Sequence, residues 1–464
     1  MEKLFKLKEN GTTIKTEILG GTTTFLTMAY IIFVNPQILG LTGMDQGAVF
    51  TATILAAVIG TFIMAFVANV PFAVAPGMGL NAFFTFTVVF GLGYTWQQAL
   101  ALVFICGLIN VFITVTKIRK MIVQAIPESL QYAISGGIGL FIAYIGIKQA
   151  RFLTFTAETP NRITDNGDGS GLFGDIIPAL TNFADPVSQV ALIGLILTIV
   201  LLLYKVKSAI LIGIIATTVL GIFFGVTTLP TLSADMFRVP SLAPTFLKLD
   251  FSGIFTGGKL LISLTTIFAF SLTDTFDTIG TFLGAGRKSG IFTEADANSV
   301  EDSKGLTTKM EKALFADATA TSIGALLGTS NTTTYVESSA GIAQGAKTGL
   351  ASVTTGVLFI VALFLSPIAL MVPGAATAPA LIVVGIFMAE GLMNIEWTNL
   401  SIAVPAFMVI AFMAFSFSIT NGIAFGFLFY AIAQIIEGKG KEVHPILYVV
   451  TILFMFSFIL NAIV

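Results

Sequence analysis

Long hydrophobic segments separated by short polar ones run through the whole sequence. Most of them approach or exceed the roughly 20 residues that an α-helix needs to cross a bilayer. They fall at about 17–38, 48–70, 72–90, 97–116, 124–147, 188–205, 208–226, 259–283, 313–328, 331–345, 349–367, 374–392, 400–418, 420–437 and 445–463. The pattern predicts an all-α polytopic membrane protein in a lipid bilayer, because a β-barrel would show short segments of alternating polarity.

The order of these segments predicts two related halves. They divide into seven, a second seven, and one more at the C-terminal end. Seven spans followed by seven gives the halves opposite orientation, which is the arrangement of an inverted repeat. We expect 400–437 to form two spans with a turn near 418–421, because one helix of that length would extend about 57 Å.

Lys and Arg residues predict the orientation in the membrane, since cytoplasmic loops carry an excess of them. Basic residues before the first span and at 117–120, 205–207 and 287–312 all fall on one side of the predicted spans. We therefore expect a multi-pass protein of the plasma membrane with a cytoplasmic N-terminus. The polar stretches at about 150–187 and 227–257 are expected to be loops on the other side.

Two predicted spans at corresponding places in the two halves do not look like continuous helices. The span at 72–90 contains Pro76, Gly77 and Gly79, and the span at 331–345 begins with a polar, threonine-rich stretch. Non-helical backbone at membrane depth is tolerated only inside protein or beside a water-filled cavity. Such paired interruptions indicate the binding site of a transporter.

Three carboxylates fall inside or beside these apolar segments: Asp274, Asp277 and Glu337. An ionisable side chain at membrane depth costs about 2.5–3.5 kcal/mol on insertion scales and normally faces a bundle interior or a wet cavity. Asp274 and Asp277 are three residues apart and share a helix face. Burial disfavours the charged form of a carboxylate, so these groups can carry a proton. Helix capping or ion pairing is the alternative role.

Other side chains near the interruptions are candidates for binding a flat, polar ligand. Glu337 precedes a short helical stretch whose N-terminal N–H groups are free to donate. Asn81 can donate and accept at once, although asparagine is also common at helix starts. Phe270 and Tyr335 could stack on a ring, although each alone is more often a packing residue.

Composition excludes several other classes of function. The chain is 55% hydrophobic and 10% charged, with a net charge of −2 and no basic stripe for nucleic acid. One cysteine (Cys106) and one histidine (His444) exclude internal disulfides, cysteine- or histidine-cluster metal sites and Ser-His-Asp triads. We expect no metal, no cofactor and no enzymatic activity.

The same segments carry a resemblance to the AzgA-like purine permeases, a branch of the nucleobase–cation symporter superfamily. The motifs are 75–84 (APGMGLNAFF), 274–283 (DTFDTIGTFL) and 332–342 (TTTYVESSAGI), with 23–30 (TTFLTMAY) and 126–137 (IPESLQYAISGG) in support. The likeness covers nearly the whole chain. In the wider superfamily the carboxylate of span 8 is a glutamate, and Asp277 stands in its place here.

The resemblance implies fourteen spans in two inverted seven-span repeats, divided between a core domain and a gate domain. The core would comprise residues 15–120 and 258–368, and the gate residues 121–228 and 369–464. Spans 3 and 10 would each carry a short strand. The gate domain would support a homodimer.

The resemblance also implies proton-coupled import of purine bases, hypoxanthine and guanine first, by alternating access. The ligand would lie between spans 1, 3, 8 and 10. The resemblance assigns the ligand to Glu337 and Asp277, and together with the position arguments above we expect the binding residues to be Glu337, Asn81, Asp277, Phe270, Tyr335, Ser338, Thr281 and Thr27. Asp277, alone or with Asp274, would carry the proton.

Three other functions remain open on the residues alone. An anion carrier could use the same architecture, but three carboxylates without a nearby Lys or Arg suit an anion poorly. An intramembrane aspartyl protease needs two carboxylates converging on a water, which two residues one turn apart on one helix provide badly. A channel fits broken helices and paired halves less well than a carrier does.

Overall fold

The computed structural model describes residues 2–116, 125–157, 162–165, 171–173, 176–229, 238–256, 259–282, 286, 289–292 and 306–463. Nine helices within these residues are long and apolar enough to cross a membrane. The chain is therefore a mostly helical, multi-pass membrane protein. The grouping into seven and seven spans stays a prediction, and the basic residues at 117–120, 287, 288 and 304 lie outside the described part.

The elements follow the predicted apolar segments closely. The first half contains α1 (Glu2–Phe5), α2 (Ile14–Met28), α3 (Ile31–Gly40), α4 (Gln46–Ile63), η1 (Met64–Ala68), β1 (Val74–Pro76), α5 (Met78–Ala82), η2 (Phe83–Gly91), α6 (Trp96–Val115), α8 (Glu128–Gln149), β2 (Leu153–Ala157), β3 (Arg162–Asp165), β4 (Gly171–Phe173), β5 (Ile176–Leu180), α9 (Pro186–Leu203) and α10 (Ala209–Phe223). The π-helical segments η1 and η2 continue α4 and α5 directly.

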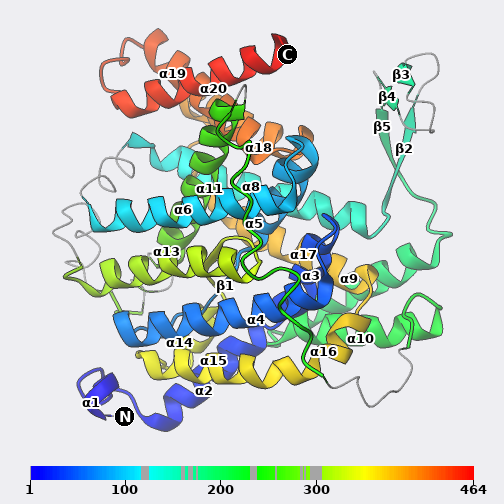
Figure 1. Cartoon of the computed structure of the whole chain (residues 1–464), viewed down its shortest axis with the longest axis vertical. Coiled ribbons are helices and arrows are strands. Elements are labelled where there is room, and N and C mark those ends of the chain that lie inside the picture. Colours follow the sequence, from blue (N-terminus) through cyan, green and yellow to red (C-terminus); the bar gives the residue numbers. More distant parts are fainter. Residues whose placement is uncertain are drawn as a thin grey trace.

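The second half contains α11 (Lys259–Thr281), α13 (Lys309–Leu327), β6 (Thr332–Thr334), α14 (Ser338–Ile342), α15 (Gly349–Ala362), η5 (Leu363–Leu365), α16 (Ser366–Met371), α17 (Gly374–Met388), η6 (Ala389–Asn394), α18 (Leu400–Phe415), α19 (Ile419–Ile436) and α20 (Pro445–Ile463). Helices α6, α13, α4 and α15 lie side by side in that order (Figure 1). Helix α8 packs on α17 and α18, and α19 and α20 lie at the end away from the N-terminus.

The two interrupted spans meet through a pair of short, fully buried strands. Strand β1 pairs antiparallel with β6, with Val74 opposite Thr334. Their outer backbone groups bond to side chains: Thr61 donates to the Val74 carbonyl at 3.1 Å and accepts from its N–H at 3.0 Å. Thr321 donates to the Thr332 carbonyl at 2.9 Å. Because lipid cannot satisfy backbone groups, these contacts allow extended chain at this depth.

The segment predicted as two spans at 400–437 forms two helices. Helices α18 and α19 pack on each other and are separated by residues 416–418. Phe417 has a φ of 54°, which reverses the chain. Ser418 then caps α19 by accepting from the Asn421 N–H at 3.3 Å. Length therefore predicted this turn to within a few residues.

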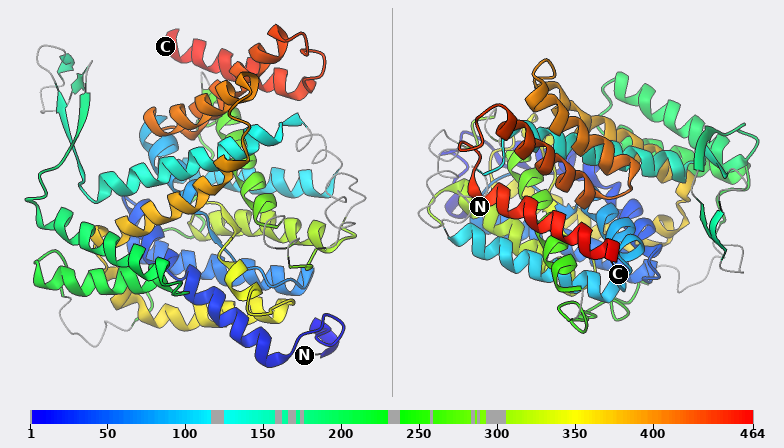
Figure 2. Two further views of the ribbon diagram at one scale, coloured as in Figure 1. Left: turned by 180° about the vertical axis from the view of Figure 1, so that it is seen from behind. Right: turned by 90° about the horizontal axis from the view of Figure 1, so that it is seen from above.

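The polar loop predicted at about 150–187 contains strands that the sequence reading missed. Strands β2 and β5 pair antiparallel, as do β3 and β4 beyond them. The ribbon projects from the helices in two views (Figures 1 and 2). At its base Arg151 donates to Asp185 at 2.8 Å, which lowers the pKa of that carboxyl. The β-branched residues Thr154, Thr156, Ile176 and Ile177 favour strands, and this signal was available in the sequence.

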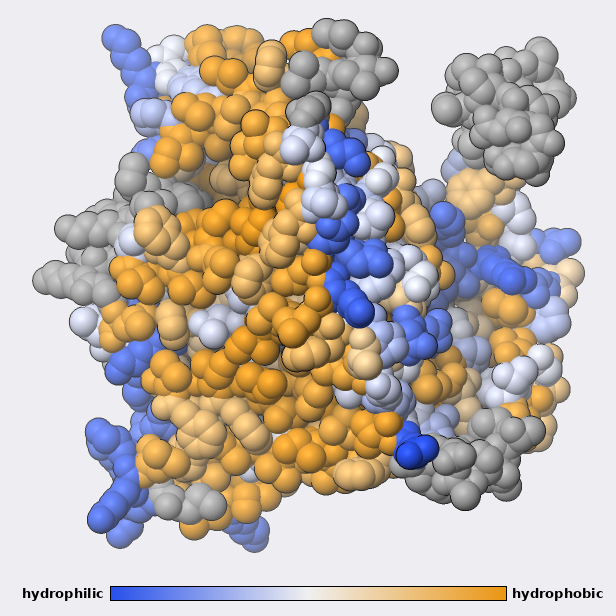
Figure 3. Space-filling view, viewed as in Figure 1, coloured by the Kyte–Doolittle hydropathy of each residue, from blue (hydrophilic) through white to orange (hydrophobic). Residues whose placement is uncertain are grey.

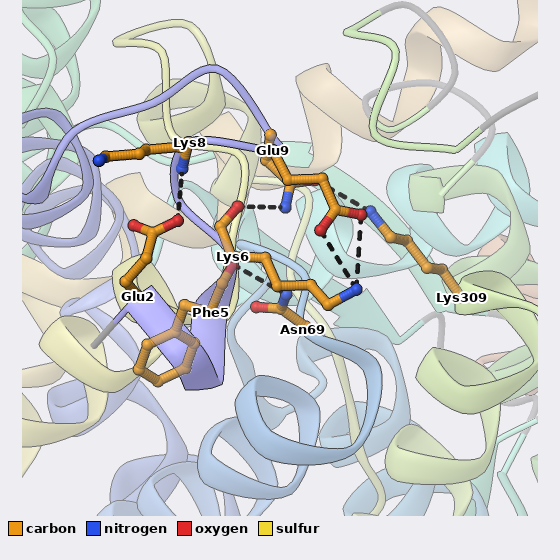
Figure 4. A network of polar contacts seen from close by, with 8 residues as sticks. Glu2, Phe5, Lys6, Lys8, Glu9, Asn69 and Lys309 are labelled. Atoms are coloured by element: carbon orange, nitrogen blue, oxygen red, sulfur yellow. Dashed lines mark hydrogen bonds and ion pairs between the residues drawn. The ribbon is translucent and has the colours of Figure 1, made fainter.

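The N-terminal segment is held against one end of the helices (Figure 4). Phe5 is buried, and its carbonyl accepts from Asn69 Nδ2 at 3.1 Å. The Asn69 side chain in turn accepts from the Gly349 N–H at 2.9 Å, which ties η1 to the start of α15. Lys309, at the start of α13, donates to the Asn10 side chain at 3.2 Å.

The outer surface matches a membrane setting. In Figure 3 hydrophobic side chains cover a broad face over α6 and α15, and hydrophilic ones gather at the N-terminal corner. Exposed apolar residues on these two helices include Leu108, Phe112, Val357 and Val361. Such an apolar band is the surface that a bilayer requires.

Close approach of α8 and α17 depends on glycine. A Cβ on Gly139 would lie 2.7 Å from the Met388 Cβ and 2.8 Å from the Gly385 carbonyl oxygen. Small residues at such contacts let helices pack tightly in membranes.

We expect Gly139→Ala to destabilise the protein by roughly 1–3 kcal/mol, because crowding outweighs the better helix propensity of alanine. Thermal unfolding in detergent measures the effect. Gly391→Ala is the matched control, since its nearest neighbour atom would be 3.6 Å away. Equal melting temperatures for both variants would contradict the importance of this contact.

Candidate functional site

A cavity lies where the paired strands meet the surrounding helices. Its polar lining comes from Tyr30, Thr273, Asp277, Thr333, Thr334 and Glu337. Its apolar wall comes from Met78, Leu80, Ile138, Tyr335, Val384 and Met388. The lining contains no Lys or Arg among the residues that the structure describes. The cavity thus combines carboxylates with flat and aliphatic surfaces, and it brings together elements from both halves of the chain.

Glu337 is placed where the sequence predicted it, at the residue before the short helix α14. Its Oε1 accepts from the Tyr30 hydroxyl at 2.6 Å. Its backbone carbonyl accepts from Thr27 at 3.3 Å. Tyr30 therefore fixes the carboxylate through one oxygen, and an ionised carboxylate has acceptor capacity left for a ligand N–H on the other.

The two aspartates of α11 have different surroundings although they were predicted to share one face. Asp277 lines the cavity and is half-buried. Asp274 is fully buried behind it, and its Oδ2 accepts from Asn110 at 2.9 Å and from Thr321 at 3.3 Å. Only Asp277 is therefore in a position to meet a ligand in this cavity.

A further buried carboxylate beside the cavity residues, Asp317 of α13, was missed by the sequence reading. It accepts from Thr278 of α11 at 2.9 Å and from Thr334 of β6 at 2.7 Å. Like Asp274, Asp317 is an ionisable residue within an apolar segment, here the one at 313–328, so the same signal marked it in the sequence. Tyr30 and Thr273, which also line the cavity, were missed as well, and nothing in their residue type distinguishes them from packing residues.

The remaining candidate binding residues take several places around this centre. Tyr335 lines the cavity, and its hydroxyl donates to the Pro76 carbonyl at 2.6 Å. Asn81 is buried and accepts from Ser330, and Ser338 accepts from the Ala73 N–H at 3.0 Å. Phe270 packs edge-on against Phe83, with ring centroids 4.5 Å apart.

Most of the candidate binding residues lie outside the cavity lining. Thr281 is buried in α11, and Thr27 donates within α2. The described cavity lining includes Tyr335 but does not include Asn81, Ser338, Phe270, Thr281 or Thr27. Ser338 bonds to the backbone beside β1 and Asn81 to the Ser330 side chain, and their direct contact with a ligand stays a prediction.

The described residues contain no group of three or more His, Cys, Asp or Glu side chains arranged to hold a metal ion. The carboxylates instead bond to hydroxyl and amide groups. This arrangement suits binding of N–H donors and of protons.

A family model described as a permease family, Xan_ur_permease, matches residues 15–429. The guanine/hypoxanthine permease PbuG of Bacillus subtilis is 42% identical over 470 residues, covering 99% of this chain and 99% of that protein. The adenine permease AdeP of Escherichia coli is 39% identical over 460 residues, covering 99% of this chain and 96% of that protein. These similarities confirm the resemblance drawn from the motifs.

Solved transporter structures share the fold. The transmembrane domain of a cyanobacterium bicarbonate transporter, BicA, has a TM-score of 0.58 at 16% identity, covering 89% of this chain and 97% of that one. The murine anion transporter Slc26a9 in the inward-facing state has a TM-score of 0.58 at 11% identity, covering 91% of this chain and 68% of that one. At such identities the likeness concerns the fold alone.

Proposed function

The chain belongs to the Permease family, and from this premise we propose that it imports purine nucleobases by proton symport across the plasma membrane. Hypoxanthine and guanine are the proposed substrates, with adenine as a further one. The observation that carries the proposal is that Glu337 and Asp277 line one cavity together with Tyr30 and Tyr335. Several relatives with this family likeness carry the names of guanine/hypoxanthine or adenine permeases.

The chemistry of the cavity suits such a ligand. A purine base is flat and carries ring N–H donors, and two carboxylates can accept from them. The aromatic and aliphatic wall can cover the ring faces. An anion such as bicarbonate or sulfate would instead face two carboxylates, so the anion-carrier alternative is disfavoured by charge.

Asp277 is the proposed carrier of the coupling proton. It lines the cavity and is half-buried, whereas Asp274 and Asp317 accept hydrogen bonds from neighbouring side chains. Asp274 lies one turn away and is proposed to share the proton. Asp317 accepts hydrogen bonds from Thr278 of α11 and from Thr334 of β6. We propose that a movement of α11 is transmitted to β6 through this side chain.

Alternating access is proposed to move a core domain (15–120 and 258–368) against a gate domain (121–228 and 369–464), with the N-terminus cytoplasmic. A small polar contact crosses this division: Gln37 of α3 donates to the Val372 carbonyl at 2.5 Å and accepts from Thr377 of α17. Gln149 of α8 also donates across the division, to the Gln37 side chain at 3.4 Å. The gate domain is also the proposed homodimer surface.

Transport by the purified protein in liposomes tests the proposal. Labelled hypoxanthine should accumulate when the outside is more acidic than the inside, and an added protonophore should stop it. Unlabelled guanine and adenine should compete. Uptake of labelled bicarbonate or sulfate without uptake of bases would favour the anion carrier, and flux without accumulation would favour a channel.

Tyr30→Phe should weaken hypoxanthine binding about fivefold to tenfold, because Glu337 loses the hydrogen bond that orients it. Equilibrium binding in detergent measures the effect. Tyr94→Phe is the matched control, since it removes a buried hydroxyl that contacts Ser263 at 2.8 Å away from the cavity. Equal affinities for both variants would mean that Tyr30 does not position Glu337.

A further inference from the structure

The hydroxyl of Thr273 is buried in the cavity wall without a partner. Thr273 is only 2% exposed, and its Oγ1 has no hydrogen-bond partner among the described residues. It lies one helical turn before Asp277 on α11, and both residues line the cavity. Leaving a buried polar group unpaired costs about 1–3 kcal/mol, so a protein keeps one where something else satisfies it.

Other threonines of the same helix behave differently. Thr265 donates to the Leu261 carbonyl at 3.0 Å, and Thr266 donates to the Ile262 carbonyl at 2.7 Å. A helical threonine usually makes this bond to the preceding turn. Thr273 makes none, although it belongs to the same regular helix. Its hydroxyl proton is therefore committed neither to the helix backbone nor to another side chain that the structure describes.

The other hydroxyl protons of the cavity lining are already in use. Tyr30 donates to Glu337 and Tyr335 donates to the Pro76 carbonyl. Thr334 donates to Asp317. Thr278 donates its single hydroxyl proton to Asp317. In the 2.8 Å contact between Thr278 and Thr333 the donor must therefore be Thr333. Among the lining residues that the structure describes, Thr273 is left as the hydroxyl donor available to a ligand.

The two carboxylates of the cavity, Asp277 and Glu337, are hydrogen-bond acceptors when ionised. They can bind the N–H groups of a purine, but they repel the exocyclic carbonyl oxygen of a 6-oxopurine. We infer that Thr273 is a substrate-binding residue whose hydroxyl donates to this carbonyl. The inference rests on the proposed function and adds to it a residue that distinguishes bases by their exocyclic oxygen.

Thr273→Val tests the inference, because valine keeps the branched shape and removes only the hydroxyl. We expect hypoxanthine to bind about tenfold more weakly to this variant of the full-length protein in detergent. Unsubstituted purine, which lacks the carbonyl, should bind within about twofold of its wild-type affinity. Thr273→Ser should restore hypoxanthine binding to within a few-fold.

The stability of the ligand-free protein supplies a second readout with a distinctive sign. Removing an unpaired buried hydroxyl should leave the melting temperature unchanged or raise it, while the added stabilisation by hypoxanthine decreases. Thr266→Val is the matched control, since Thr266 is equally buried, bonds within its helix and does not line the cavity. It should keep wild-type affinity for hypoxanthine.

The outcomes separate this inference from the proposed function. Wild-type protein that binds no purine base overturns both. Wild-type protein that binds hypoxanthine, with a Thr273→Val variant that binds it equally tightly, overturns only the role of Thr273. An equal loss of affinity for hypoxanthine and unsubstituted purine also overturns it, and so does a Thr273→Ser variant that does not restore hypoxanthine binding. In either case the hydroxyl would not donate to the exocyclic carbonyl.

Discussion

Glu337→Gln is expected to abolish high-affinity binding of hypoxanthine, with a loss on the order of 100-fold or more. The glutamine side chain has one carbonyl oxygen, and the Tyr30 hydroxyl would occupy it as it now occupies Oε1. The amide group would then turn a donor toward a ligand N–H. A favourable charge-assisted hydrogen bond is thus replaced by two opposed donors.

Equilibrium binding and liposome uptake measure this effect, and a size-exclusion profile in detergent shows whether the variant is folded. Glu396→Gln is a suitable control, because Glu396 is exposed and lies outside the cavity. A folded Glu337→Gln variant that takes up hypoxanthine at the wild-type rate would remove Glu337 from the site.

Asp277→Asn is expected to stop accumulation while weakening binding much less. A neutral amide cannot take up and release a proton during the transport cycle, although it can still accept one hydrogen bond. The variant should therefore equilibrate the base across the membrane at best. Asp277→Glu, which restores a carboxyl group, should recover part of the proton-driven uptake.

Uptake between about pH 5 and pH 8, measured beside equilibrium binding at the same values, distinguishes coupling from affinity. Accumulation in the Asn variant that still follows the pH gradient would mean that another group carries the proton. Asp274→Asn and Asp317→Asn, measured in the same way, would then identify it.

The sequence predicted the positions of the helices well because segment length and hydrophobicity act locally. A bilayer requires an apolar stretch of a given length, so the stretches themselves mark α2 to α20. The interruptions were also visible, since Pro76 and the threonine-rich stretch before Glu337 disfavour helix. The β2–β5 ribbon was missed because its polar, glycine-rich surroundings suggested a plain loop.

Which acidic residue faces the cavity and which is buried behind it could not be predicted in the same way. Asp274 and Asp277 are about 60° apart around a helix axis, so either could face a cavity. Packing of α6 and α13 decides that Asp274 meets Asn110 and Thr321. The position of Asp317 beside the cavity is set by its hydrogen bonds from Thr278 and Thr334, which lie in other elements of the chain.

By itself the sequence determined that this is a multi-pass membrane protein with interrupted spans, carboxylates at membrane depth and the motifs of purine permeases. Each of these is a property of consecutive residues. The tertiary structure alone decided that β1 and β6 pair, that Tyr30 donates to Glu337 and that Thr273 has no hydrogen-bond partner in the part of the chain that the structure describes. Those features depend on which segments come to lie beside each other, and the local pattern of residues along one sequence does not determine that.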